Sequence, residues 1–143
     1  DIQLSLSQSA TITGALIVTT PQDVALLDAR RAIEMFKKVE VPIIGIVENM
    51  SVHICEKCGH KEEVFGSGGG VRLAAEYETE VIGRLPLDIG VRERTDAGRP
   101  IVESLPLSSA SKAYMQLSIT LDERVSQKVA SDIAKPIFSV TED

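Results

Sequence analysis

The segment from His53 to His60 holds the residues whose types and spacing point most directly to chemistry. It contains Cys55 and Cys58, the two cysteines of the chain, followed by Gly59. A Cys-x-x-Cys-Gly turn places two thiolates on one side of a tight backbone loop, and glycine suits a position with positive φ. Two such sulfurs are half of a tetrahedral metal site, or two of the four ligands of an iron–sulfur cluster.

This half-site can be completed in two ways. His53 and His60 can supply nitrogen ligands for a zinc ion, or a second subunit can supply its own cysteine pair across a two-fold axis. A thioredoxin-like redox pair would open a helix directly after a strand. Here the pair lies in a polar loop, so we disfavour the redox role. Two uncoordinated thiols on a loop are the remaining alternative.

A glycine-rich run, Phe65-Gly66-Ser67-Gly68-Gly69-Gly70, precedes a helix expected over residues 71–77. Glycine-rich backbone at a helix N-terminus can bind phosphate through its N–H groups. No Gly-Lys-Ser/Thr follows, and no Walker A lysine motif occurs in this chain. From these residues alone, we therefore favour a tight turn or hinge over a phosphate site.

Asn49 follows an expected strand at the position where ligands bind in open α/β sheets. Its amide offers a donor and an acceptor, which would suit the edge of an adenine base. Asparagine at a strand end is also a common turn former, and the residues alone favour that interpretation. Asp28 and Asp88 are indistinguishable from ordinary capping or surface residues by spacing.

The elements that would position these residues alternate between strand and helix. Apolar, β-branched runs predict strands buried on both faces at residues 15–20 and 43–47. Between them, Thr20-Pro21 is a helix-start signal, because the threonine hydroxyl is able to cap a helix, and an amphipathic helix follows it up to Val41-Pro42. This βαβ unit predicts a parallel sheet. Further along we expect a strand at residues 80–83, a short helix at 91–97 and a long helix from Ser109. Residues 1–8 resemble the start of a helix within a fold.

Composition excludes several functional classes. The 143 residues carry 15 Lys and Arg against 21 Asp and Glu, a net charge of −6, and only 3% are aromatic. The acidic balance argues against nucleic acid as a partner. No apolar stretch approaches the length of a membrane span, and no secretory leader opens the chain, so we expect no membrane partner. Two closely spaced cysteines are typical of a reducing compartment, which predicts a cytoplasmic protein.

Six short motifs occur in a characteristic order over about residues 1 to 120. They are Thr19–Ala25 (TTPQDVA), Gly45–Ser51 (GIVENMS), Cys55-x-x-Cys58-Gly59, Phe65–Gly70 (FGSGGG), Gly83–Asp88 (GRLPLD) and Asp96–Val102 (DAGRPIV). In this order and spacing they resemble the Mrp/ApbC family of iron–sulfur carrier ATPases, within the deviant-Walker P-loop NTPases that include the MinD-like proteins.

The resemblance implies an α/β parallel-sheet fold of the P-loop NTPase type and an ATP-dependent, homodimeric carrier. Its subunits would share a bridging 4Fe–4S cluster that passes to apo iron–sulfur proteins. Cys55 and Cys58 would be the metal ligands. Asn49 would contact adenine, the loop Pro86-Leu87-Asp88 would line the base pocket mainly through its backbone, and Thr20 to Gln22 would lie near the nucleotide or the dimer face.

The resemblance also implies that this chain matches only the C-terminal half of such an ATPase. Residues 1–123 would be the C-terminal part of the ATPase domain, with the cysteine insertion at 53–60, and residues 124–143 a C-terminal helix or tail. The family's P-loop, with its lysines and Mg²⁺ ligand, lies N-terminal to the matching motifs. We therefore expect the chain alone to be inactive as an ATPase. Two alternatives are a structural zinc-binding module and a MinD-like partitioning or scaffold ATPase.

Overall fold

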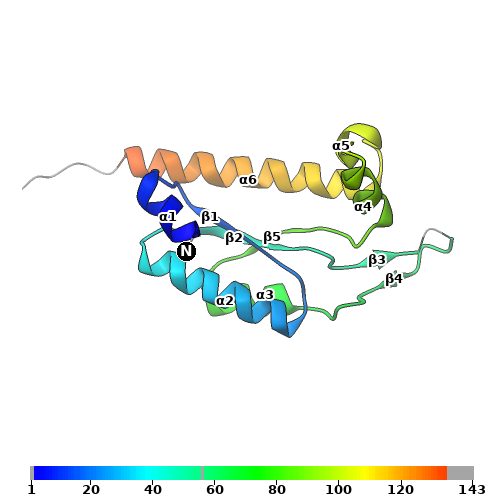
Figure 1. The fold of residues 1–143 in the computed structure, drawn as a ribbon, viewed down its shortest axis with the longest axis horizontal. Helices are drawn as coiled ribbons and strands as arrows, with labels where there is room; N and C mark the ends of the chain where they lie inside the picture. Colours follow the sequence, from blue (N-terminus) through cyan, green and yellow to red (C-terminus); the bar gives the residue numbers. More distant parts are fainter. Residues whose placement is uncertain (1, 56, 135–143) are drawn as a thin grey trace, which may run out of the picture.

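A three-stranded parallel sheet forms the centre of the fold. The computed structural model describes residues 2–55 and 57–134 (Figure 1). The strands β1 (Ala15–Thr19), β2 (Ile43–Glu48) and β5 (Val81–Arg84) lie in the order β1-β2-β5. Ile17 is paired with Ile46, and Glu48 with both Thr19 and Arg84, so the carboxyl ends of all three strands meet at one edge. The expected α/β parallel-sheet fold is confirmed.

Helices cover both faces of this sheet. The helices α2 (Asp23–Lys38) and α3 (Gly69–Glu76) lie on one face, and α6 (Ser109–Ile133) lies along the other (Figure 1). Ile33 of α2, Ile46 of β2 and Leu73 of α3 are completely buried in the core between the first two layers. On the other face, α6 packs so closely that a Cβ on Gly83 would lie 2.8 Å from Leu117 Cδ1. Burial of apolar side chains in both layers stabilises this arrangement.

The remaining elements lie at the ends of the layers. The helix α1 (Ile2–Ser9) precedes β1, while α4 (Ile89–Asp96) and α5 (Ile101–Ser104) lie near the start of α6. The strands β3 (His53–Ile54) and β4 (Lys61–Glu62) form an antiparallel hairpin that extends away from the sheet (Figure 1). Among the described residues, no helix combines the length and the apolar character that a membrane span requires.

Three expectations about this architecture are corrected. First, β1 is not buried on both faces, because the side chain of Val18 is 58% exposed. Second, α2 begins at Asp23 with Gln22 as its N-cap residue, and the Thr20 hydroxyl donates to Gln22 Oε1 rather than capping the helix. Third, the polar loop that holds the cysteines is flanked by two short strands that no sequence pattern predicted, so it is the turn of a β-hairpin.

The expected boundary between residues 123 and 124 falls inside α6. This helix continues without a break to Ile133, because Ser108 caps its start and no glycine or proline interrupts it. The described part of residues 124–143 is therefore the second half of a helix that also packs on the sheet. The rest of that stretch, residues 135–143, lies outside the described residues.

Candidate functional site

Both cysteines lie in the turn of the β3–β4 hairpin. The Cys55 N–H donates to His60 O at 2.9 Å, and the Gly59 N–H donates to Cys55 O at 2.8 Å, which closes the turn. Gly59 has a φ of +70°, as expected from its place after the second cysteine. Cys55 is half-buried and Cys58 is exposed. The hairpin therefore holds a cysteine pair at metal-ligand spacing on a projecting turn.

Backbone hydrogen bonds fix the root of the hairpin to the segment that follows β5. The Ser51 N–H donates to Leu85 O at 3.0 Å and the Leu87 N–H to Val52 O at 2.8 Å. His53 adds a side-chain contact, since its Nδ1 lies 3.2 Å from Leu87 O. A carbonyl oxygen only accepts hydrogen bonds, so this geometry assigns the proton to Nδ1. The parallel pairing of β2 and β5 thus continues toward the cysteines.

Within the described ranges 2–55 and 57–134, no three His, Cys, Asp or Glu side chains cluster closely enough to hold a metal ion. His60 is exposed in the turn, and His53 faces the Leu87 carbonyl at the hairpin root. The described geometry therefore does not assemble the intramolecular zinc site in which both histidines join the cysteine pair.

Asn49 lies at the carboxyl edge of the sheet, directly after β2. Its N–H donates to Thr19 O at 2.7 Å, and its Oδ1 accepts from the N–H of Met50, which has a φ of +54°. Asn49 thus has the turn-forming role that the residues alone favoured. Its Nδ2 group has no partner among the described residues, and Asn49 is one of the residues that line a cavity of about 570 Å³ between β1 and α2.

The loop Pro86-Leu87-Asp88 lies at the same edge of the sheet but on a separate cavity. Asp88 is the N-cap of α4, and its Oδ1 accepts from the N–H groups of Gly90 at 2.7 Å and Val91 at 3.4 Å. Pro86 lines a cavity of about 270 Å³ together with Glu48, Arg84 and the start of α6. The described residues therefore do not bring Asn49 and Pro86 into one cavity.

Glu48 is a buried carboxylate that the sequence analysis did not single out. It is only 3% exposed at the end of β2 and accepts a 2.7 Å hydrogen bond from the Gly70 N–H. Arg84 Nε lies 3.8 Å from its other oxygen. The amino end of α3 therefore receives a carboxylate of the protein itself, and the glycine-rich run serves close packing and a turn. The position of Glu48 at the carboxyl end of a predicted strand was the sequence signal that could have identified it.

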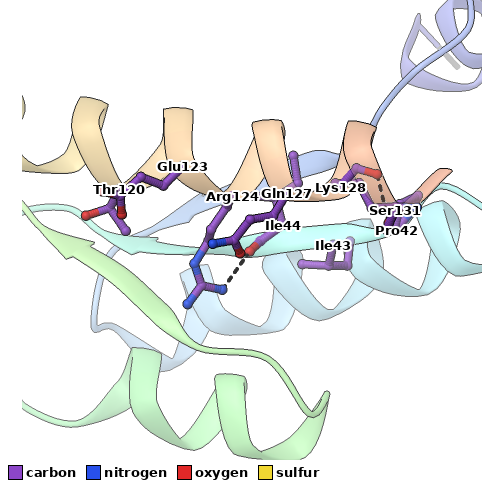
Figure 2. A pocket seen from close by; sticks show the side chains of 9 residues that line it. All are labelled: Pro42, Ile43, Ile44, Thr120, Glu123, Arg124, Gln127, Lys128 and Ser131. Carbon is purple, nitrogen blue, oxygen red and sulfur yellow. Dashed lines mark hydrogen bonds between the residues drawn. The ribbon is translucent and has the colours of Figure 1, made fainter. Parts of the chain in front are cut away.

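A cavity of about 680 Å³ lies between the start of β2 and the second half of α6 (Figure 2). Arg124 crosses it, donating from Nη1 to Ile44 O at 3.2 Å and forming an ion pair with Glu80. Figure 2 shows the other polar side chains of this cavity arranged along α6. It lies at the amino end of the sheet, away from the cysteine hairpin.

The parallel sheet with helices on both faces has the fold of the MinD-like P-loop NTPases. The cell division ATPase MinD of Pyrococcus furiosus has the same fold, with a TM-score of 0.62 and 24% identity over 78% of this chain and 43% of that one. An Archaeoglobus fulgidus nucleotide-binding protein solved with ADP is 36% identical, with a TM-score of 0.59, over 67% of this chain and 40% of that one.

The family is defined more narrowly by sequence. Residues 1–121 match the family model for ParA, described as NUBPL iron-transfer P-loop NTPase, and the chain belongs to this family. It is 56% identical over 118 residues to the iron–sulfur cluster carrier protein of Escherichia coli K12, a match that covers 82% of this chain and 32% of that protein. The mouse iron–sulfur cluster transfer protein NUBPL is 47% identical over 125 residues, 87% of this chain and 39% of that protein. The chain thus spans about a third of the length of these relatives.

Proposed function

We propose that this chain is the cluster-binding part of an ATP-dependent iron–sulfur carrier. Cys55 and Cys58 would bind one side of a 4Fe–4S cluster, and the same pair of a second copy would bind the other side. The cluster is cargo, and it would leave when thiolates of an apo iron–sulfur protein replace those of the carrier. The observation that carries this proposal is the cysteine pair on a projecting hairpin turn, in a family of iron-transfer NTPases.

The geometry of the hairpin supports sharing between two copies. A 4Fe–4S cluster takes four thiolate ligands, and the chain has two cysteines. Cys58 is exposed in the turn, and this hairpin projects beyond the sheet (Figure 1). Two such turns can therefore approach each other across a two-fold axis, with each copy contributing two ligands.

The position of the hairpin root supports a link to nucleotide binding. Asn49 is separated from His53 by three residues, and the intervening segment is hydrogen-bonded to residues 85–87. We assign the adenine contact to the Asn49 amide, and the lining of the base pocket to Pro86, Leu87 and the backbone of Asp88. The parts that grip the phosphates and Mg²⁺ would come from the rest of the full-length protein.

Anaerobic reconstitution of the full-length protein with ferrous iron and sulfide tests the proposal. We expect about four iron and four sulfide per dimer and a broad absorbance at about 400 nm. The double variant Cys55→Ala with Cys58→Ala should lose this iron and the absorbance. His60→Ala and Lys57→Ala, in the same turn, are matched controls that should retain both.

Two outcomes would overturn this assignment. An unchanged iron content in the double cysteine variant would place the cluster elsewhere. Alternatively, one zinc per monomer in aerobically purified protein, lost in His60→Ala and in His53→Ala, would identify the turn as a structural zinc site.

A further inference from the structure

We propose that the outward face of α6 is a self-association surface that pairs antiparallel with the same helix of a second copy. Six residues of α6, separated alternately by four and three positions, define this face, which we call the α6 stripe: Met115, Ile119, Asp122, Ser126, Val129 and Ile133. Because an α-helix turns about 100° per residue, all six lie within about 40° of one line along the helix.

The α6 stripe is separate from the face that packs on the sheet. Leu117, which contacts the sheet at Gly83, and Arg124, which bonds to Ile44 O, lie roughly 160° to 180° around the helix from Met115. The four apolar side chains of the stripe are between 40% and 79% exposed. Figure 1 shows α6 as the outer layer of the fold. These side chains are therefore available to another helix.

Alternating spacings of four and three are the pattern of a coiled-coil seam, in which apolar residues recur every 3.5 positions on average. The seam runs over 19 residues, from Met115 to Ile133, which corresponds to about 27 Å of helix. Its two polar members, Asp122 and Ser126, lie in the middle, and its apolar members lie on either side. A polar pair inside an apolar seam specifies the register and the orientation of the partner.

The orientation follows from the position of the carboxylate. In an antiparallel pair centred on residue 124, Met115 faces Ile133 of the other copy and Ile119 faces its Val129. Asp122 then faces Ser126, whose hydroxyl can donate to the carboxylate, and the two-fold axis repeats each contact. In a parallel pair in register, Asp122 would face another Asp122, and the like charges would repel. The α6 stripe therefore favours an antiparallel arrangement with α6 of a second copy.

This surface is distinct from the cysteine hairpin, which extends from the carboxyl edge of the sheet. Full-length protein carrying Cys55→Ala and Cys58→Ala, without nucleotide, tests the stripe independently of any cluster-bridged dimer. We expect sedimentation velocity to show a monomer–dimer equilibrium as concentration rises. Ile119→Lys alone and Val129→Glu alone should each weaken the association constant at least about tenfold, since either places a charge against an apolar side chain.

The double variant that combines Ile119→Lys with Val129→Glu determines the register. In the antiparallel pair the lysine introduced in one copy would face the glutamate introduced in the other, so association should return to within about threefold of the starting protein. Gln127→Lys, on another face of α6, is the matched control and should leave association unchanged. Circular dichroism establishes whether each variant is folded.

Several results would overturn the proposal. One is full-length protein that stays monomeric at every concentration, as it would if the rest of the protein covers the stripe. Another is a dimer whose association constant neither single variant reduces. A double variant that associates more weakly than either single variant would contradict the antiparallel register.

Discussion

The carboxylate of Glu48 and the backbone N–H of Gly70 are joined by a 2.7 Å hydrogen bond that links the end of β2 to the first turn of α3. The two groups approach so closely that a Cβ on Gly70 would lie 2.8 Å from Glu48 Oε2. A carboxylate at a helix N-terminus satisfies an unpaired donor and interacts favourably with the helix dipole. This contact therefore holds the glycine-rich run against the carboxyl edge of the sheet.

We expect Glu48→Ala to lower the free energy of unfolding by about 1–3 kcal/mol, because it leaves the buried Gly70 N–H without an acceptor. Glu48→Gln should lose less, about 1 kcal/mol or below, since its amide oxygen can still accept that bond. Urea unfolding of the two variants measures the difference. Glu62→Ala, an exposed glutamate of β4, is the control and should be nearly neutral. Equal losses for Ala and Gln would contradict the role of the hydrogen bond.

The sequence predicted the elements whose signals are local. The β-branched runs and the helical spacing of Ala29 and Ile33 correctly indicated β1, α2 and β2. A central strand leaves a continuous apolar run, and burial of one helix face leaves an apolar pattern with the helical period. The expected burial of both faces of β1 was wrong at Val18, which is exposed. Whether a strand face is buried depends on the elements that pack against it, and these are not encoded in the strand's own residues.

The contacts that position the candidate site are not local. Glu48 meets Gly70 across 22 positions, and His53 meets Leu87 across 34. Such pairs depend on the register of β2 and β5, which hydrophobic patterns do not specify residue by residue. The cysteine pair could be found from sequence because its two ligands are three positions apart. The hairpin that carries this pair could not be predicted from sequence, because β3 and β4 are only two residues long each, which is too short for a strand pattern.

Tyr77, which follows α3, provides a test by titration. Burial raises the pKa of its phenol above the usual 10.0, and a hydrogen bond to Glu34 and the charge of that carboxylate raise the pKa further. The folded state thus favours the neutral phenol, so this contribution to stability is present below pH 10.0 and is lost as the pH rises through the raised pKa. Glu34→Gln should bring the pKa of Tyr77 closer to its ordinary value.

The phenolate absorbance of the protein, less that of Tyr77→Phe, isolates the titration of this one side chain. Glu78→Gln is a suitable control, since that neighbouring carboxylate is not among the groups that shift the Tyr77 pKa. An identical Tyr77 titration with and without Glu34 would show that the carboxylate does not act on the phenol.

Arg124 should be the side chain that docks the second half of α6. Its guanidinium donates to Ile44 O and pairs with Glu80 (Figure 2 shows the first of these contacts). We expect Arg124→Ala to cost about 1–2 kcal/mol of unfolding free energy, because both contacts are lost. Glu80→Ala should cost about 0.5 kcal/mol or less, since Glu80 is largely exposed and the carbonyl contact remains. Chemical unfolding of both, with Gln127→Ala as a neutral control, measures this order. The reverse order would assign the docking to the ion pair instead.

Asn49 and Asp88 lie at the same edge of the sheet, but we expect substitution of Asn49 to lower ATP affinity and substitution of Asp88 to lower stability. Asn49→Ala removes the Nδ2 group that has no partner in the described part of the chain, so we expect ATP to bind the full-length protein about tenfold more weakly. Asp88→Ala removes the cap of α4, so we expect a loss of about 1 kcal/mol in unfolding free energy. Because we assign only its backbone to the base pocket, ATP affinity should then stay within about twofold. Asp88→Asn keeps a capping oxygen and should restore stability.

Calorimetric titration with ATP and thermal unfolding of each variant separate the two roles. A stable Asp88→Asn protein that binds ATP poorly would instead assign the Asp88 carboxylate to the nucleotide, and unchanged ATP binding in Asn49→Ala would remove Asn49 from the base contact.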